Sequence, residues 1–217
     1  AVGLPVKESE KHFIGNSNGA MMRTALMGMA FLADDDLNRR QWITEIALAT
    51  HSHERAVATS LIASKLFSQA LQDPNIDIEK VAEGEAQAIG YADFFSTHFD
   101  EKAQVSLDPL HTLKTVITIA ASSSTVEQAY IRACEQGGDT DTVSALAGAL
   151  VSLRFPSSHR FFSIPWVNQV RWSEISEAGR ALEIIYRARN CSVWIVGPVA
   201  WDSVRYHDGL SIERPGG

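Results

Sequence analysis

The sequence predicts an all-α fold, a compact domain of several helices followed by a short irregular or β-like tail. Apolar residues recur at helical spacing in successive segments, for example at Leu61, Ile62 and Leu66. Glycines, prolines and clusters of Asp, Ser and Thr separate these segments, as is typical where one helix ends and another begins. β-favouring residues gather only near the C-terminus, at 192–196.

Each helix is indicated by its own pattern or boundary signal. After an irregular start, residues 20–33 are almost wholly apolar and are expected to form one buried helix that ends at Asp34–Asp36. Asp108 before Pro109 marks another helix start, because proline suits the first turn. The remaining helices are expected at about 38–50, 52–71, 77–99, 109–121, 125–136, 143–155 and 173–189. We expect a helical domain over 1–190 and a C-terminal extension over 191–217.

The amino-acid composition and net charge exclude some classes of function. The chain has 217 residues, of which 45% are hydrophobic and 21% charged, as in soluble single-domain proteins. The net charge of −7 argues against a nucleic-acid partner, since phosphate-backbone binding needs Lys and Arg, but it leaves a small anionic ligand open. No leader pattern and no long apolar run is present, so we expect a cytoplasmic protein without a membrane partner. Cys134 and Cys191 are expected to be reduced core thiols.

One stretch has the chemistry of a metal site. Residues 137–142 read Gly-Gly-Asp-Thr-Asp-Thr and run directly into an apolar helical pattern. Their carboxylates and hydroxyls are hard oxygen ligands that suit Mg²⁺, and the glycine pair precedes a helix start that would hold them rigidly. The alternative is a helix cap, in which Asp139 or Thr140 only satisfies free backbone amides. A cap explains one such residue better than four in a row, which favours the metal site.

Two further stretches could bind a ligand. Residues 15–23 form a loop of small residues that enters a helix, which suits a phosphate group, although an Asn-Gly turn is more often only a turn. His51 and His53 are two residues apart, which disfavours a zinc pair on a helix face. At a helix start, an imidazole there could instead donate a hydrogen bond to an anion. A solvated capping segment is equally compatible with this pattern.

Other polar or aromatic groups favour structural roles. The acidic run Asp34–Asp36 is expected to be a solvated helix end, because consecutive side chains point in different directions. Asp108 and His111 have the residue types of an acid–base pair, but capping by Asp108 is the simpler account. Trp194 and Trp201 are expected to pack rather than to stack on a nucleobase.

Taken together, three stretches resemble the ADP-ribosylglycohydrolase family, which includes the dinitrogenase-reductase-activating glycohydrolases and the ADP-ribosyl-acceptor hydrolases. They are Asn18-Gly-Ala-Met-Met-Arg23, Thr50-His-Ser-His53 and Gly137-Gly-Asp-Thr-Asp-Thr142, in that order. The third is quite specific, the first moderately so, and the second is weak alone. The similarity extends over about residues 15–172, including 164–170.

The resemblance implies an all-α fold with a binuclear Mg²⁺ centre that hydrolyses the N- or O-glycosidic bond of ADP-ribose. The substrate would be an ADP-ribosylated protein or a small ADP-ribosylated acceptor. Asp139 and Asp141 would serve the reaction and, with Thr142, would hold metal. The ADP-ribose pocket would be shaped by residues of the first two stretches, with the histidine near the phosphates: Asn18, Gly19, Ala20, Met21, Arg23 and His51.

The chain departs from the family pattern at its start. Members usually carry a Gly-Asp-Ala-type helix and a Thr-Asp-Asp-Thr stretch before the Asn-Gly-Ala-Met-Met-Arg motif, and these supply the other metal ligands. Here 17 residues precede Asn18, and none is an aspartate. The resemblance therefore implies half of a two-metal site, with one Mg²⁺ ion or none. Three interpretations stay open: an enzyme that is shown without its N-terminal segment or completes its site from elsewhere in this chain, a catalytically impaired relative that binds ADP-ribose or a protein partner, and a helical protein outside the family whose Asp/Thr turn is only a cap.

Overall fold

The computed structural model describes residues 15–32, 35–100 and 103–155, together with residue 180 and three short strands of the tail. Within the first three ranges, regular structure is helical apart from one isolated bridge between Val105 and Gly138. The helices in chain order are α1 (Gly19–Thr24), the 3₁₀ helix η1 (Leu26–Ala30), α2 (Asp36–Leu48), α3 (Glu54–Gln72), α4 (Ile78–Ala88), α5 (Asp93–Ser96), α6 (Pro109–Ser122), α7 (Val126–Gln136) and α8 (Thr140–Arg154). The all-α prediction is confirmed for this part of the chain.

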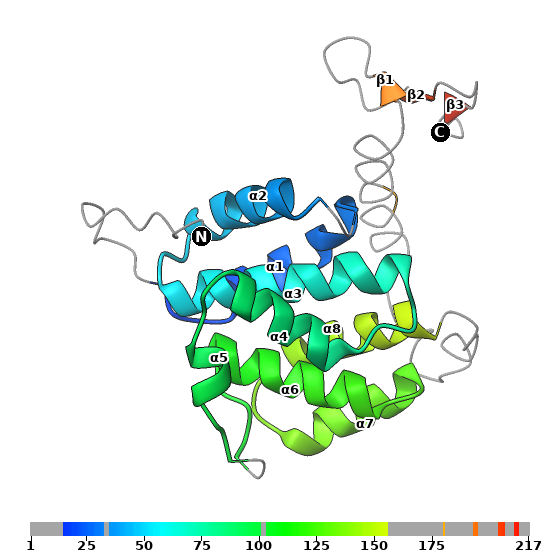
Figure 1. The fold of residues 1–217 in the computed structure, drawn as a ribbon. Coiled ribbons are helices and arrows are strands. Elements are labelled where there is room, and N and C mark those ends of the chain that lie inside the picture. Colours follow the sequence, from blue (N-terminus) through cyan, green and yellow to red (C-terminus); the bar gives the residue numbers. More distant parts are fainter. Residues whose placement is uncertain are drawn as a thin grey trace, which may run out of the picture.

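Helix α3 lies in the middle of these helices, with α2 on one side and α6 on the other (Figure 1). It also contacts α1, η1, α4 and α8. Nearly all its side chains from Ala56 to Ala70 are buried, as expected of a helix surrounded by others. His53 caps its start by accepting a hydrogen bond from the backbone N–H of Arg55 at 3.1 Å. The helices that carry the candidate site, α1 and α8, thus pack on the most buried element.

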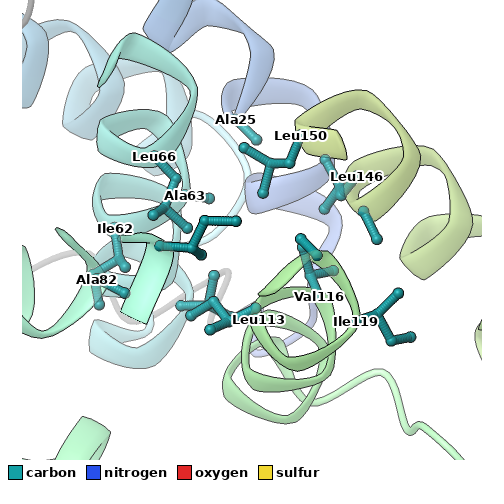
Figure 2. Close-up of a cluster of buried hydrophobic side chains, with 14 of the residues drawn as sticks. Ala25, Ile62, Ala63, Leu66, Ala82, Leu113, Val116, Ile119, Leu146 and Leu150 are labelled. Carbon is teal, nitrogen blue, oxygen red and sulfur yellow. The ribbon is translucent and has the colours of Figure 1, made fainter. Parts of the chain in front are cut away.

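The main apolar core forms where α3, α6 and α8 meet. Figure 2 shows Leu66 of α3, Leu113 and Val116 of α6, and Leu146 and Leu150 of α8 gathered in this region. None of the five is more than 3% exposed. Burial of each such side chain stabilises the fold by about 1.5–3 kcal/mol, so this core holds together segments that are far apart in sequence.

The expectation of one helix over 20–33 was wrong. The α-helix ends at Thr24, and the chain continues as the 3₁₀ helix η1. Gly28 in η1 presses against the backbone of Ser64 in α3, so closely that a Cβ at position 28 would lie 1.9 Å from the Ser64 carbonyl oxygen. We attribute the tighter winding to this close approach, a tertiary contact that overrides the local helical preference.

The expected helix over 77–99 is also interrupted. Helix α4 ends at Ala88, Gly90 takes a left-handed conformation with φ of +73°, and the short α5 follows. Cys134 is exposed rather than buried, because α7 turns Ala129 and Ala133 toward the core instead. The other helices of the described ranges begin and end within about three residues of their expected positions.

The described part of the tail is β-structured, as its composition predicts. Strands β1 (Val193–Trp194), β2 (Val204–Tyr206) and β3 (Ser211–Ile212) pair antiparallel in the order β1-β2-β3. The helix expected at 173–189 lies outside the described residues except for residue 180, which is helical. No helix in the described part of the chain combines the length and the apolar character that crossing a membrane requires.

Candidate functional site

The turn between α7 and α8 is shaped by two glycines. Gly137 and Gly138 have φ of +68° and +77°, the left-handed region that other residues rarely adopt. Gly138 lies against residue 105, where a Cβ would come within 2.1 Å of the Val105 carbonyl oxygen. The Val105 N–H donates to the Gly137 carbonyl at 3.2 Å, and the Asp139 N–H donates to the Val105 carbonyl at 2.9 Å. These contacts fix the start of α8.

Asp139 occupies the N-cap position of α8, but its side chain makes no capping hydrogen bond. Its carboxylate instead accepts a hydrogen bond from the side-chain amide of Asn18. Asn18 is 2% exposed. Its amide also donates to the Thr112 hydroxyl at 2.9 Å, and its backbone N–H donates to the Leu107 carbonyl at 2.9 Å. The simple cap interpretation of Asp139 is therefore wrong, because this carboxylate faces α1.

The next two polar residues of the turn differ in exposure. Asp141 is exposed, and the neighbouring Asp139 side chain first, and the Thr142 N–H second, hold its pKa below its usual value. Thr142 is 3% exposed, and its hydroxyl donates to the Met22 sulfur at 3.4 Å. The start of α8 thus carries two neighbouring carboxyl groups, beside a buried hydroxyl and an exposed thioether.

A second polar cluster surrounds His51. Its Nε2 lies 2.9 Å from the Ser17 hydroxyl, and its Nδ1 lies 2.7 Å from the Thr50 hydroxyl. Arg23 donates to the Thr50 hydroxyl and, at 3.4 Å, to the Gly19 carbonyl. Burial first, and the charge of Arg23 second, hold the pKa of His51 below its usual value, so the ring is neutral at pH 7.

The segment 15–23 joins the two clusters, because Ser17 faces His51 while the next residue faces Asp139. Gly19 lies close to the histidine ring, where a Cβ would come 3.2 Å from His51 Nε2. Ala20 and Met21 are fully buried, so their side chains support this segment from the core side. The stretches 18–23 and 137–142 thus come together through Asn18 and Asp139. The stretch 50–53 lies beside them through the contact of His51 with Ser17.

Other residues singled out in the sequence have structural roles. Asp36 is not a solvated helix end: its carboxylate pairs with Lys65 at 2.8 Å and with Arg39 at 3.0 Å. Asp108 caps α6, as expected, by accepting backbone hydrogen bonds at 2.9 and 3.0 Å. His111 stacks on Phe99 with 4.3 Å between ring centroids rather than pairing with Asp108. Residue 34 and the side chains of the two tail tryptophans lie outside the described residues.

The oxygen donors at the start of α8 fit a magnesium ion in kind. Asp139, Asp141 and Thr142 supply carboxylate and hydroxyl oxygens, and Mg²⁺ commonly keeps several waters beside one or two carboxylates. Two neighbouring carboxylates repel each other, and a bound divalent cation would relieve that repulsion. Within the described ranges no group of three or more His, Cys, Asp or Glu side chains is gathered as a metal site would require. The donors present therefore amount to part of a coordination shell.

Some residues of this site carry no sequence signal. Thr112 follows one turn after the Asp108 cap, and nothing in its neighbours indicates that Asn18 would reach it. Ser17 reads as a member of a turn, and Met22 as one apolar residue among many. Only the three-dimensional fold brings these side chains to the site, since each partner lies at least 34 residues away in the chain.

The chain is similar in sequence to known proteins. The ADP-ribosylglycohydrolase family model matches residues 4–191, a range that contains every site residue named above. Over 141 residues the chain is 28% identical to the ADP-ribosyl-[dinitrogen reductase] glycohydrolase of Rhodospirillum rubrum, which covers 64% of this chain and 46% of that protein. The chain thus spans about half the length of this curated relative. By its family match, the chain belongs to the ADP-ribosylglycohydrolase family.

Proposed function

We propose that this protein is a Mg²⁺-dependent ADP-ribosyl glycohydrolase that removes ADP-ribose from a modified protein or small acceptor. The family match supports glycosidic-bond hydrolysis as the reaction class. One structural observation carries the proposal further: Asp139 is turned away from its own helix and toward Asn18, 121 residues earlier in the chain. A capping role does not explain that orientation, whereas a shared ligand site does.

Each cluster has its own proposed role. Asp139, Asp141 and Thr142 would hold magnesium, which when bound would polarise the ribose hydroxyls and a water molecule. The carboxylate of Asp141, ionised at neutral pH, is exposed and free to accept a hydrogen bond from the attacking water. Asn18 keeps the Asp139 carboxylate aimed at the site through the hydrogen bond described above.

The His51 cluster would bind the diphosphate. Arg23 contributes a positive charge on the exposed side of α1, and His51 is held in place by Ser17 and Thr50. Gly19 leaves room beside the ring that a larger residue would fill. A guanidinium is a charge-assisted hydrogen-bond donor to phosphate oxygens, whereas the single N–H of the neutral imidazole would have to exchange its hydroxyl partner for a phosphate oxygen.

The partner in this proposal is an ADP-ribosylated protein in the cytoplasm. The relative from Rhodospirillum rubrum is named for ADP-ribosylated dinitrogen reductase, which makes a modified protein the natural first substrate to test. The net charge of −7 suits a protein or nucleotide ligand held by local contacts better than a nucleic acid held by a broad basic surface.

The test is release of ADP-ribose from an ADP-ribosylated protein, measured with Mg²⁺ and with a chelator. We expect release by the native chain only with Mg²⁺, and its loss in Asp141→Ala. Glu83→Ala, which removes an exposed carboxylate from α4, should release ADP-ribose as the native chain does. Absence of Mg²⁺-dependent release by the native chain would contradict the proposal. Tight ADP-ribose binding in chelator without release would instead identify the impaired relative.

A further inference from the structure

The loop between α5 and α6, residues 103–108, touches both halves of the candidate site. At one position, the Val105 N–H donates to the Gly137 carbonyl at 3.2 Å, and the Val105 carbonyl accepts a hydrogen bond from the Asp139 N–H at 2.9 Å. Two residues later, the Leu107 carbonyl receives the Asn18 N–H at 2.9 Å. The carbonyls that accept the backbone N–H groups of Asn18 and Asp139 therefore belong to one short loop, and the side chains of these two residues meet in the site.

A side-chain path runs through the same loop. The Asn18 amide donates to the Thr112 hydroxyl at 2.9 Å, and that hydroxyl in turn donates to the Ser106 carbonyl at 3.2 Å. Ser106 also approaches His111 Nδ1, with its hydroxyl at 3.2 Å. The position of Asn18 thus depends on the loop through its side chain as well as through its backbone.

The loop ends at Asp108, which is held by an arginine from the buried helix α3. Arg55 Nη1 donates to Asp108 Oδ2 at 2.7 Å, while the other carboxylate oxygen caps α6. Burial alone would raise the pKa of Asp108, but the hydrogen bonds from His111 N–H and Arg55 hold it below the usual value. Arg55 also reaches Asp93 of α5, through Nη2 at 3.1 Å. Its guanidinium therefore braces both ends of the segment that connects these helices.

We propose that Arg55 is a positioning residue for the site: its ion pair with Asp108 fixes the 103–108 loop, which sets Asn18 against Asp139. The ion pairs of the Arg55 guanidinium go to Asp108 and Asp93 rather than to Asn18 or Asp139, so it acts through the loop. The inference rests on the proposed function for its effect on ligand binding. Its effect on the loop can be measured without any ligand.

The first readout is amide hydrogen exchange of the full chain, followed by NMR at Asn18 and Asp139. Both N–H groups donate to the loop, so local release of the loop exposes them. We expect Arg55→Met to speed exchange at both amides about tenfold or more relative to the core amide of Val116. Arg55→Lys, which keeps a charge for Asp108, should restore most of the protection.

Three further variants separate positioning from general stability. Asp108→Asn keeps a capping side chain but removes the charge, and should speed exchange at both amides as Arg55→Met does. Asp93→Asn removes the other partner of Arg55 and should leave both amides protected. Arg40→Met breaks a comparable half-buried ion pair, to Glu85 at 2.8 Å, away from the loop and serves as the matched control.

The second readout is ADP-ribose affinity with Mg²⁺ in the same variants. We expect Arg55→Met and Asp108→Asn to weaken it about tenfold, while Arg40→Met binds as the native chain does. Equal exchange at Asn18 and Asp139 in Arg55→Met and Arg40→Met would overturn the inference, as would unchanged affinity alongside faster exchange. If the native chain binds no ADP-ribose, the proposed function fails, and the exchange comparison alone decides whether Arg55 holds the loop.

Discussion

Asn18 uses its side-chain amide on two partners, the Asp139 carboxylate and the Thr112 hydroxyl. A buried amide costs free energy unless its hydrogens are satisfied, so this residue and its partners determine one another's positions. Asp141 is different, because it is exposed and no Lys or Arg within residues 15–32, 35–100 and 103–155 forms an ion pair with it. At the scale of single residues, the site combines one rigidly held carboxylate with one that is open to a ligand.

Tyr91 gives a pH-dependent test of the region around Arg55. Burial raises the pKa of its phenol to about 12, although the charge of Arg55 acts in the opposite direction. The folded protein therefore keeps the phenol neutral at pH values where the unfolded chain has lost its proton. This contribution to stability is complete below about pH 10, the ordinary tyrosine value, and is lost as pH rises toward 12.

The measurement is the free energy of unfolding by urea, from pH 8 to 11.5, for the native chain and Tyr91→Phe. Phenylalanine has no proton to lose, so the difference between the two curves isolates this phenol. We expect the native chain to lose about 1–2 kcal/mol relative to the variant over that range, since one pKa unit corresponds to about 1.4 kcal/mol. Parallel curves would show that the phenol titrates normally.

Alanine substitutions at two glycines of packed helices are expected to change the free energy of unfolding in opposite directions. Gly28 lies against α3, and a Cβ there would meet the Ser64 backbone at 1.9 Å. Gly28→Ala must push η1 and α3 apart, and we expect it to cost about 2–3 kcal/mol of unfolding free energy. Gly84 in α4 has open space around it, so Gly84→Ala should stabilise the protein by about 0.5–1 kcal/mol. Urea denaturation measures both, and equal effects would contradict the close packing of η1 on α3.

A buried charge network ties α2, α3 and α4 together. Arg39 has a fully buried side chain and donates to Glu85 at 2.6 Å, to the Leu61 carbonyl at 2.8 Å and to Ser64 at 2.8 Å. Asp36 supplies a second carboxylate at 3.0 Å. Removing one partner of such a pair leaves a buried charge only partly compensated.

Glu85→Gln should therefore cost about 3 kcal/mol of unfolding free energy, measured by urea denaturation. The matched control is Asp77→Asn, which removes an exposed ion pair with Lys80 while keeping a residue that can cap α4. It should leave the unfolding midpoint unchanged. A similar midpoint shift in both variants would mean that burial of the charge network contributes nothing to the free energy of unfolding.

For the molecule as a whole, the sequence predicted the helices that carry local signals. Asp108 before Pro109, and Thr125 ahead of α7, both cap helices as their positions suggest. Features that depend on contacts between residues far apart in the chain were not predicted. The break after α1 requires Gly28 to meet Ser64, and the ion pair of Asp36 with Lys65 requires α2 and α3 to meet in the fold.

In the candidate site, too, the sequence indicates some features, and only the fold reveals the others. The residue types at 137–142 indicate magnesium chemistry, and the family resemblance groups that stretch with 18–23 and 50–53. Neither indicates that Asp139 would turn from its helix to Asn18, or that the 103–108 loop would hold both. Those contacts come from packing around α3, which no local pattern encodes.

We propose that Asn18, His51 and the start of α8 form one Mg²⁺-dependent ADP-ribose site. Calorimetric titration of the full chain with ADP-ribose, in Mg²⁺ and in chelator, tests it most directly. We expect binding in Mg²⁺ that weakens about tenfold or more in chelator, in Asp139→Ala and in Arg23→Ala. Binding that is equally tight in Asp139→Ala, or no binding by the native chain in Mg²⁺, would contradict it.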